Sequence, residues 1–436
     1  MRRAPHTLLL LMAAIPAALA AQQPGPSRPL SLLQAIELGR QQGVSAVVAR
    51  LNVRAADARV GQRRADLLPD ISGAASVSRQ TVNLDEFGIP IASGVTDPFT
   101  IWRLQLRASQ AVFDPSAIAR LRAARDTAAA AGLDARAVGE IAGATAGLAY
   151  LEVLSADETV RARQADSTVA ATLLDEARQL VGAGVSPAID ATRSEVSFGA
   201  VRTQLEVART AADRARLDLL RTLDLPPATR LTLADSLGLG AMDIPLDPDQ
   251  AAAFAREHRA ELAAERARTT AVERNLKSIK YENLPSLGLS GSYQQTGQRT
   301  GDLAGSYSVQ LQLSVPILDG FRRQSRAKEE SERLEVQRIR ERDLGNQVET
   351  EARESVLDLA SAQQQAAIAG DRLRLAEQEL SQAQERFRSG VAGSVETTNA
   401  QSSVIAARDA LIQARLNYGT ARVSAYRALG VIDHLQ

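Results

Sequence analysis

The chain has 436 residues, a formal net charge of +0 and a pI of about 6.9, so its overall charge gives no reason to expect a nucleic-acid partner. It contains no cysteine, which excludes disulfides, thiolate metal sites and a lipid-modified N-terminal cysteine. Aromatic residues make up only 3%, fewer than a compact core of this size normally uses, and the chain is rich in Ala, Arg, Glu, Gln and Leu, as long helices are.

The N-terminal residues 1–21 have the pattern of a cleaved secretory signal. Arg2 and Arg3 precede an apolar run, 8–19, that is too short to span a membrane. The small residues at 18 and 20 form a cleavage site, with Ala20 or Ala21 as the last residue removed. The alternative is a buried N-terminal helix. No later run reaches the ~18 apolar residues of a membrane helix, so none is expected.

The rest of the chain is an internal repeat, which decides the fold class more firmly than any single segment. ADLLPDISGAASVS, from Ala65, matches YENLPSLGLSGSYQ, from Tyr281. ARQLVGAGVSPAIDATRSE, from Ala177, matches AQERFRSGVAGSVETTNAQ, from Ala383. We therefore predict a first repeat, a connector and a second repeat, at residues 22–225, 226–247 and 248–436.

Each repeat has the pattern of a helix, two strands, a long helix, a sharp turn and a return helix. In the first repeat the five elements are predicted at 30–68, 70–82, 99–112, 115–181 and 187–225. In the second repeat they are predicted at 248–283, 285–296, 304–315, 320–388 and 395–429. The fold class is thus mostly α with a small β part.

The two long helices carry a heptad seam, in which apolar residues alternate at spacings of four and three. A helix of this length, at ~1.5 Å per residue, forms a rod of roughly 100 Å. An ordinary solenoid or spectrin-like rod would explain the helices but not the strands. The seam of the second repeat is Val348, Ala352, Ser355, Leu359, Ala362, Ala366, Ala369, Leu373, Ala376, Leu380, Ala383 and Phe387. The seam of the first is Ala142, Ala146, Ala149, Val153, Ala156, Val160, Arg163, Ser167, Ala170, Leu174, Ala177 and Val181, which only Arg163 interrupts.

The strands alternate between apolar and polar residues. This pattern suits a transmembrane β-barrel with a wet interior, and it also suits a soluble sheet lying on a layer of helices. The export signal and the absence of a second apolar layer favour the barrel. Four strands cannot close a barrel, since the smallest membrane barrels have ~8, so several copies of the chain would share one. The predicted lipid-facing residues are Trp102, Leu104, Leu106, Val309, Leu311, Leu313 and Val315.

The chain resembles the TolC-like outer membrane efflux proteins over nearly all of its predicted mature length. The resemblance lies in the strand-to-helix joins LSVPILDGFRR (313–323) and SQAVFDP (109–115), in the hairpin tip FRSGVAGSVETTNAQ (387–401) and in the duplication. It implies a homotrimer with a barrel of about twelve strands in the outer membrane, standing on a periplasmic α-helical coiled-coil tunnel. It further implies a passive exit duct for tripartite efflux or type I secretion, working with a periplasmic adaptor and, through it, an inner-membrane transporter.

The resemblance also places functional residues at the two hairpin tips. It implies that Asp190 and Glu396 line a closed periplasmic aperture, with Asn399 where some members have a further acid. An alternative is that both acids only favour their helix N-termini. The tip residues implied to dock the adaptor are Gly184, Val185, Ser186, Gly390, Val391 and Ala392.

Other functions are weaker hypotheses. A periplasmic coiled-coil adaptor or scaffold would share the hairpins, but adaptors generally have one hairpin flanked by β-rich domains. The run EHRAE places Glu257 and Glu261 one helical turn apart beside His258, yet it lacks the second histidine of a zinc-protease motif. We therefore expect no catalytic residue, cofactor or metal.

Overall fold

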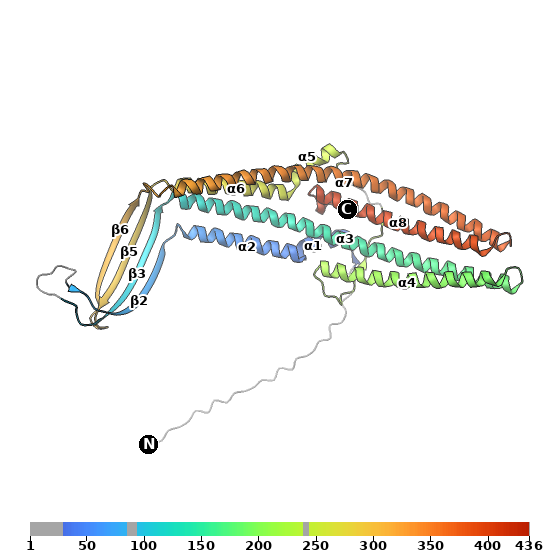
Figure 1. Ribbon diagram of the computed structural model, residues 1–436, viewed down its shortest axis with the longest axis horizontal. Helices are drawn as coiled ribbons and strands as arrows, with labels where there is room; N and C mark the ends of the chain where they lie inside the picture. Colours follow the sequence, from blue (N-terminus) through green and yellow to red (C-terminus); the bar gives the residue numbers. More distant parts are fainter. Residues whose placement is uncertain (1–28, 85–93, 239–243, 436) are drawn as a thin grey trace, which may run out of the picture.

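A computed structural model describes residues 29–84, 94–238 and 244–435, so the predicted signal sequence lies outside the described residues. The chain is elongated, with a small sheet at one end and a layer of long helices that extends from it (Figure 1). The helices and strands, in chain order, are β1 Pro29–Leu30, α1 Leu32–Gln42, α2 Val44–Ala65, β2 Asp70–Gln80, β3 Phe99–Phe113, α3 Pro115–Gly182, α4 Ala188–Thr222, β4 Thr232–Leu233, α5 Pro248–His258, α6 Ala260–Tyr281, β5 Ser286–Gly297, β6 Ala304–Ser314, α7 Arg322–Arg388, α8 Ser394–Ala428 and η2 Ile432–His434.

The long helices and the strands confirm the predicted elements to within three residues at each end. Asp114 caps the start of α3, because its Oδ1 accepts hydrogen bonds from the Ser116 and Ala117 amides at 2.9 and 3.0 Å. Pro115 follows at the first helical position, where its missing N–H costs no helical hydrogen bond.

The opening helix of each repeat was predicted as continuous, and this was wrong in both cases. Gly43 separates α1 from α2 with φ −52° and ψ 134°, and Arg259 separates α5 from α6 with φ −65° and ψ 115°. The predicted one-turn pairing of Glu257 with Glu261 was therefore also wrong, because the two acids lie on different helices. Glycine at position 43 is a poor helix former and was a signal for the first break, whereas Arg259 is an ordinary helix former and gave no signal for the second.

Burial of the Arg259 guanidinium explains the second break. The side chain is only 3% exposed and donates to Glu351 and to the Ala428 carbonyl, each at 3.0 Å, and to Glu261 at 2.6 Å. Such a group needs several acceptors once it is removed from water. The bend between α5 and α6 allows one side chain to reach acceptors on α6, α7 and α8.

The sheet has four antiparallel strands in the order β2-β3-β5-β6, so the second strand of the first repeat pairs with the first strand of the second. Within the described residues, β2 and β6 have a partner on one side only. A separate parallel pair, β1 and β4, lies beside the helices.

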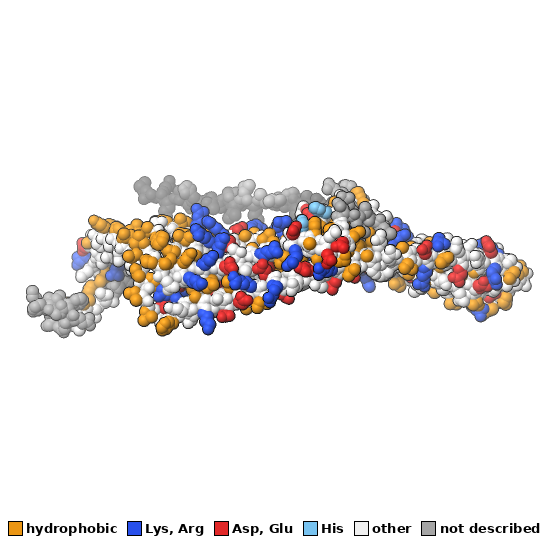
Figure 2. Space-filling model, turned by 90° about the horizontal axis from the view of Figure 1, so that it is seen from above, with side chains coloured by type: hydrophobic (Ala, Val, Ile, Leu, Met, Phe, Trp, Pro, Cys, Tyr) orange, Lys and Arg blue, Asp and Glu red, His pale blue; other side chains and the backbone are white. Residues whose placement is uncertain are grey.

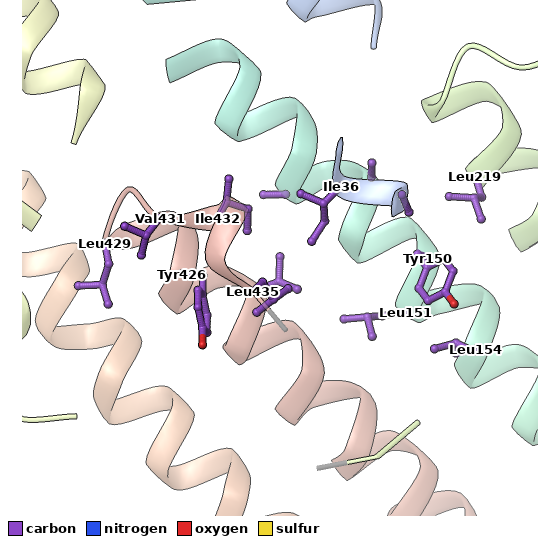
Figure 3. Packing of buried hydrophobic residues seen from close by; sticks show 14 of the residues in the cluster. Ile36, Tyr150, Leu151, Leu154, Leu219, Tyr426, Leu429, Val431, Ile432 and Leu435 are labelled. Atoms are coloured by element: carbon purple, nitrogen blue, oxygen red, sulfur yellow. The ribbon is translucent and has the colours of Figure 1, made fainter. Parts of the chain in front are cut away.

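The main core lies midway along the helical layer, near the C-terminus (Figure 1), and Figure 3 shows its buried side chains from close by. Ile36, Tyr150, Leu219 and Ile432 are almost fully buried there. The Tyr150 hydroxyl donates to the Leu30 carbonyl at 2.8 Å and lies 3.0 Å from Asp235 Oδ2, which anchors β1 and the connector to α3. Burial raises the pKa of this hydroxyl.

The seams are buried as the heptad pattern predicts. Every named seam position of α7 is buried except Leu373, which is half-buried, and the α3 seam mixes buried with half-buried positions. Contrary to expectation, α3 does contain an 18-residue window apolar enough to cross a membrane by composition. Because 61% of that window is buried inside the protein, its apolar character is accounted for by packing.

Candidate functional site

The strand register brings the predicted lipid-facing residues onto one face of the sheet. Residues directly opposite in neighbouring strands share a face. Leu106 lies opposite Tyr293, which lies opposite Tyr307, and Val309 is two residues along β6 from Tyr307. Trp102, Leu104 and Leu106 on β3 therefore lie on the same face as Val309, Leu311 and Leu313 on β6.

That face is apolar and open. Val309, Leu311 and Leu313 are 73%, 63% and 64% exposed, and Val315, just after β6, is exposed as well. The residues between them are polar, and on that opposite face the Ser292 and Ser308 hydroxyls are 2.9 Å apart and hydrogen-bonded. Isolated exposed apolar residues are normal on a soluble surface, but a contiguous face of this kind marks an interaction with a membrane or a partner.

Sequence reasoning missed the paired tyrosines on this face. Tyr293 and Tyr307 lie directly opposite each other on β5 and β6, and Tyr307 is 83% exposed. Tyrosines with an apolar body and a polar tip are enriched at membrane–water interfaces. The sequence did contain a signal for them, because Leu287, Leu289 and Tyr293 are all at odd-numbered residues of β5 and therefore point to the same face of the strand.

At the far end of the helices, the two predicted tips adopt the same turn. Gly184 and Gly390 both have φ +71°, a left-handed conformation that suits glycine. In the first tip the Val185 amide donates to the Leu180 carbonyl, and in the second the Val391 amide donates to the Arg386 carbonyl, at 2.9 and 3.0 Å. These bonds, with those of the glycine amides, form a Schellman motif that ends each long helix.

The two tips are neighbours in space (Figure 1). A Cβ at Gly390 would lie 3.7 Å from Val185 Cγ1. Val185 and Val391 are exposed, as an interaction surface requires, and Ser186 and Ala392 are half-buried beside them. The structure thus brings the six tip residues together into one blunt end.

The two tip acids have different surroundings. Asp190 is 5% exposed and accepts a hydrogen bond from the Ser394 hydroxyl at 2.6 Å, which joins α4 to α8. Glu396 is exposed and forms an ion pair with Arg386 at 3.0 Å. Asn399 is exposed and borders a shallow groove between α4 and α8. Whether the three line an aperture between subunits stays a prediction.

Sequence reasoning also missed an ionic cluster between α3 and α8. Arg163 donates to Asp166 at 2.8 Å and to Asp409, and Asp166 also pairs with Arg408. Burial raises the pKa of Asp166, an effect opposed by Arg408 and Arg163. Arg163, which looked like an interruption of the seam, therefore joins the first repeat to the second.

A family model for the Outer membrane efflux protein family matches residues 40–223 and 253–431. The chain belongs to this family. The two matched segments cover most of the chain, which agrees with the resemblance read from the strand-to-helix joins and the tips.

Two relatives match this chain in sequence over part of their length. Protein CyaE of Bordetella pertussis is 27% identical over 331 residues, which are 71% of this chain and 64% of CyaE. Outer membrane efflux protein BepC of Brucella suis is 23% identical over 65% of this chain and 61% of BepC. The match thus spans just under two thirds of the length of each relative.

Solved structures show the same fold at low identity. The Campylobacter jejuni CmeC outer membrane channel superposes with a TM-score of 0.80 at 15% identity, over 92% of this chain and 86% of CmeC. The Neisseria gonorrhoeae MtrE outer membrane channel, solved in its open state, gives 0.77 at 18% identity, over 93% of this chain and 90% of MtrE. The fold is therefore that of outer membrane channels.

Proposed function

We propose that this protein is the outer membrane duct of a tripartite efflux or type I secretion system, through which substrates leave passively. The observation that carries the proposal is the sheet of four strands, with one apolar exposed face and a single partner for each of its edge strands. In lipid every backbone polar group needs a partner, so such edges are tolerated only where another chain pairs with them. Family membership and the outer membrane channel fold support the same conclusion.

The assembly we propose is a homotrimer with one barrel of about twelve strands, in which β6 of each subunit pairs with β2 of the next. The helices would form a periplasmic tunnel, and the tips would meet a periplasmic adaptor that links the duct to an inner-membrane transporter. Export to this location would use the predicted signal sequence, cleaved after residue 20 or 21.

The absence of native cysteine allows a direct test of the shared barrel. A cysteine at Val309, combined in turn with one at Ile71, Gly73 or Ala75, should give a disulfide-linked trimer in the outer-membrane fraction for at least one pairing. The control pairs Leu106→Cys with Val309→Cys, since β3 is a central strand and should give no cross-link between subunits. If all three cysteine combinations gave only monomer, the proposal would be contradicted.

The acidic aperture is tested by conductance in a planar bilayer. We expect the purified protein to give discrete cation-preferring steps, because carboxylates held close together attract cations. Glu396→Gln breaks the ion pair with Arg386 and should loosen the closed tip, so conductance should rise while cation preference falls. Asp190→Asn/Glu396→Gln should raise conductance further, because it also weakens the contact with Ser394. A folded oligomer without channel activity would favour the adaptor or scaffold, whereas channels unchanged in both variants would leave the two acids only a structural role.

A further inference from the structure

The chain contains three lysines, Lys277, Lys280 and Lys328, and all three lie next to the sheet. Two are in the last turns of α6, and the third is in the second turn of α7. At about 1.5 Å per residue, each lies within roughly 10 Å of the helix end that meets the sheet. Every other cation of the chain is arginine, so the lysines are confined to one level of the molecule.

Exposed arginines lie at the same level on α2 and α7. Figure 2 shows Lys and Arg side chains in a band where the hydrophobic surface of the sheet gives way to the helices. We define the basic collar as six exposed cations at this level of the molecule: Arg59, Arg64, Lys277, Lys280, Arg322 and Lys328.

Within the described residues, three carboxylates at this level are paired with other arginines, whereas Asp70, at the start of β2, forms no ion pair. Asp66 pairs with Arg63 at 3.6 Å, Glu282 with Arg326 at 2.8 Å and Asp319 with Arg323 at 2.7 Å. Over the described ranges, no collar cation forms an ion pair with a carboxylate. The collar therefore presents positive charge without a neutralising partner, which favours an external anion.

Between the collar and the strands lies a rim of exposed apolar side chains. Ile317, Leu318 and Phe321, in the join from β6 to α7, are 93%, 76% and 67% exposed, and Tyr281 and Leu284 are exposed at the matching end of α6. A soluble anion would gain nothing from such a rim. A phospholipid would, since its acyl chain can lie on the apolar side chains while its headgroup reaches the lysines.

We propose that the basic collar and the apolar rim bind anionic phospholipids of the leaflet next to the helical layer, and so fix the depth of the sheet in the membrane. This inference rests on the proposed function, because it requires the sheet to lie in a bilayer. The apolar strands, the apolar rim and the cations follow one another along the molecule in the same order as the hydrocarbon, the interface and the charged headgroups of a bilayer. Each cation close to an anionic membrane surface contributes about fivefold to affinity.

The test uses tryptophan quenching by brominated lipids in phosphatidylcholine vesicles. Trp102, the single tryptophan of the chain, lies near the end of β3 remote from the helices and reports whether the sheet is in lipid at all. A collar reporter is made by Tyr281→Trp in a Trp102→Phe background, which places the fluorophore beside Lys280. Brominated phosphatidylglycerol and brominated phosphatidylcholine are compared as quenchers of each reporter.

We expect phosphatidylglycerol to be favored about tenfold over phosphatidylcholine at the collar reporter at low salt, and less at high salt, because salt screens exposed charges. Lys277→Gln/Lys280→Gln/Lys328→Gln should lower the preference at least fivefold, although three collar arginines remain. The matched control is Arg214→Gln/Arg340→Gln/Arg372→Gln, which removes three exposed cations farther from the sheet on α4 and α7. It should leave the preference for phosphatidylglycerol unchanged.

The two hypotheses fail differently. Quenching of Trp102 by both lipids, with no preference at the collar reporter or an equal preference in the lysine variant, would overturn the lipid site and leave the duct intact. No quenching of Trp102 by either lipid, together with no channel activity, would overturn the proposed function itself.

Discussion

The two long hairpins, α3–α4 and α7–α8, have nearly the same backbone but different surroundings. Their helices have 68 and 35 residues in the first hairpin and 67 and 35 in the second. α3 packs against helices of both repeats, whereas α7 makes its main contacts with α5, α6 and α8 and leaves Leu357, Ile368 and Leu375 exposed. The comparison shows that seam spacing and tip turns set the backbone, while position in the molecule decides what each side chain does.

The largest expected difference is at the last seam position before each tip. Phe387 is 2% exposed, whereas Val181, at the same position of α3, is half-buried. Phe387→Ala should lower the free energy of unfolding by about 4 kcal/mol, and Val181→Ala by about 1 kcal/mol. Denaturant unfolding of the detergent-solubilised protein, followed by circular dichroism, measures both. Equal losses would show that the two tips are packed alike.

The ionic cluster is the next largest difference. Arg163 occupies the seam position that Ala369 fills in α7, so only the first hairpin depends on charge there. Arg163→Ala should cost about 3 kcal/mol, because Asp166 stays buried with one cation fewer. Arg163→Met/Asp166→Leu should recover most of that loss, since packed apolar residues often replace a buried ion pair at little cost. If the double variant is as unstable as the single one, packing rather than charge explains the effect.

A smaller, pH-dependent difference comes from Glu140, two residues before the α3 seam, where α7 has Asn346. Burial, and then Glu261, raises the pKa of Glu140 from 4.5 to about 7. Between these values the folded chain binds this proton and the unfolded chain does not, so the free energy of unfolding should fall as pH rises from about 4.5 to about 7. Glu140→Gln should abolish this fall and be about 2 kcal/mol more stable than the native protein above pH 7.

The matched experiment measures unfolding at pH 4 and pH 8. At pH 4 the native protein and Glu140→Gln should differ little in stability, since the carboxyl is mostly protonated in both the folded and the unfolded chain. Asn346→Asp is the reciprocal variant, and it should have little effect because position 346 is exposed. A native protein whose stability does not change over this range would contradict the assigned burial of Glu140.

The smallest expected difference is between the tip acids. Ser394→Ala leaves the buried Asp190 carboxylate without its hydroxyl donor and should cost about 1.5 kcal/mol. Glu396→Ala breaks only an exposed ion pair and should cost about 0.5 kcal/mol or less. Thermal unfolding of both variants, with Arg386→Ala as a control that breaks the same exposed pair, separates the buried acid from the exposed one.

Much of the fold followed from periodicity and repetition. The alternation in β3 and β6, the heptad seams and the Gly-containing tips each specify local geometry, and their elements were predicted closely. The break at Gly43 was missed although glycine is a poor helix former, and the break at Arg259 could not be read locally because it depends on contacts with α7 and α8.

The candidate sites were predictable to the same degree. The apolar face of the sheet and the positions of the tips could be read from the sequence, since both depend on short-range spacing. The burial of Asp190 under Ser394 and the pairing of Arg163 with Asp409 could not, because each partner lies more than 200 residues away. Long-range side-chain pairing is set by tertiary packing, which a single sequence does not reveal.

The outer sides of β2 and β6, which have no strand partner among the described residues, have a consequence for biogenesis. In the proposed duct, a newly exported copy would present two strand edges and an apolar face to water, and such edges pair readily with any other extended chain. Productive assembly therefore competes with aggregation, and its rate depends on how many copies are present together. For the duct proposed above, a holding chaperone on the export route would favour assembly, and overexpression without one should yield aggregates before pores.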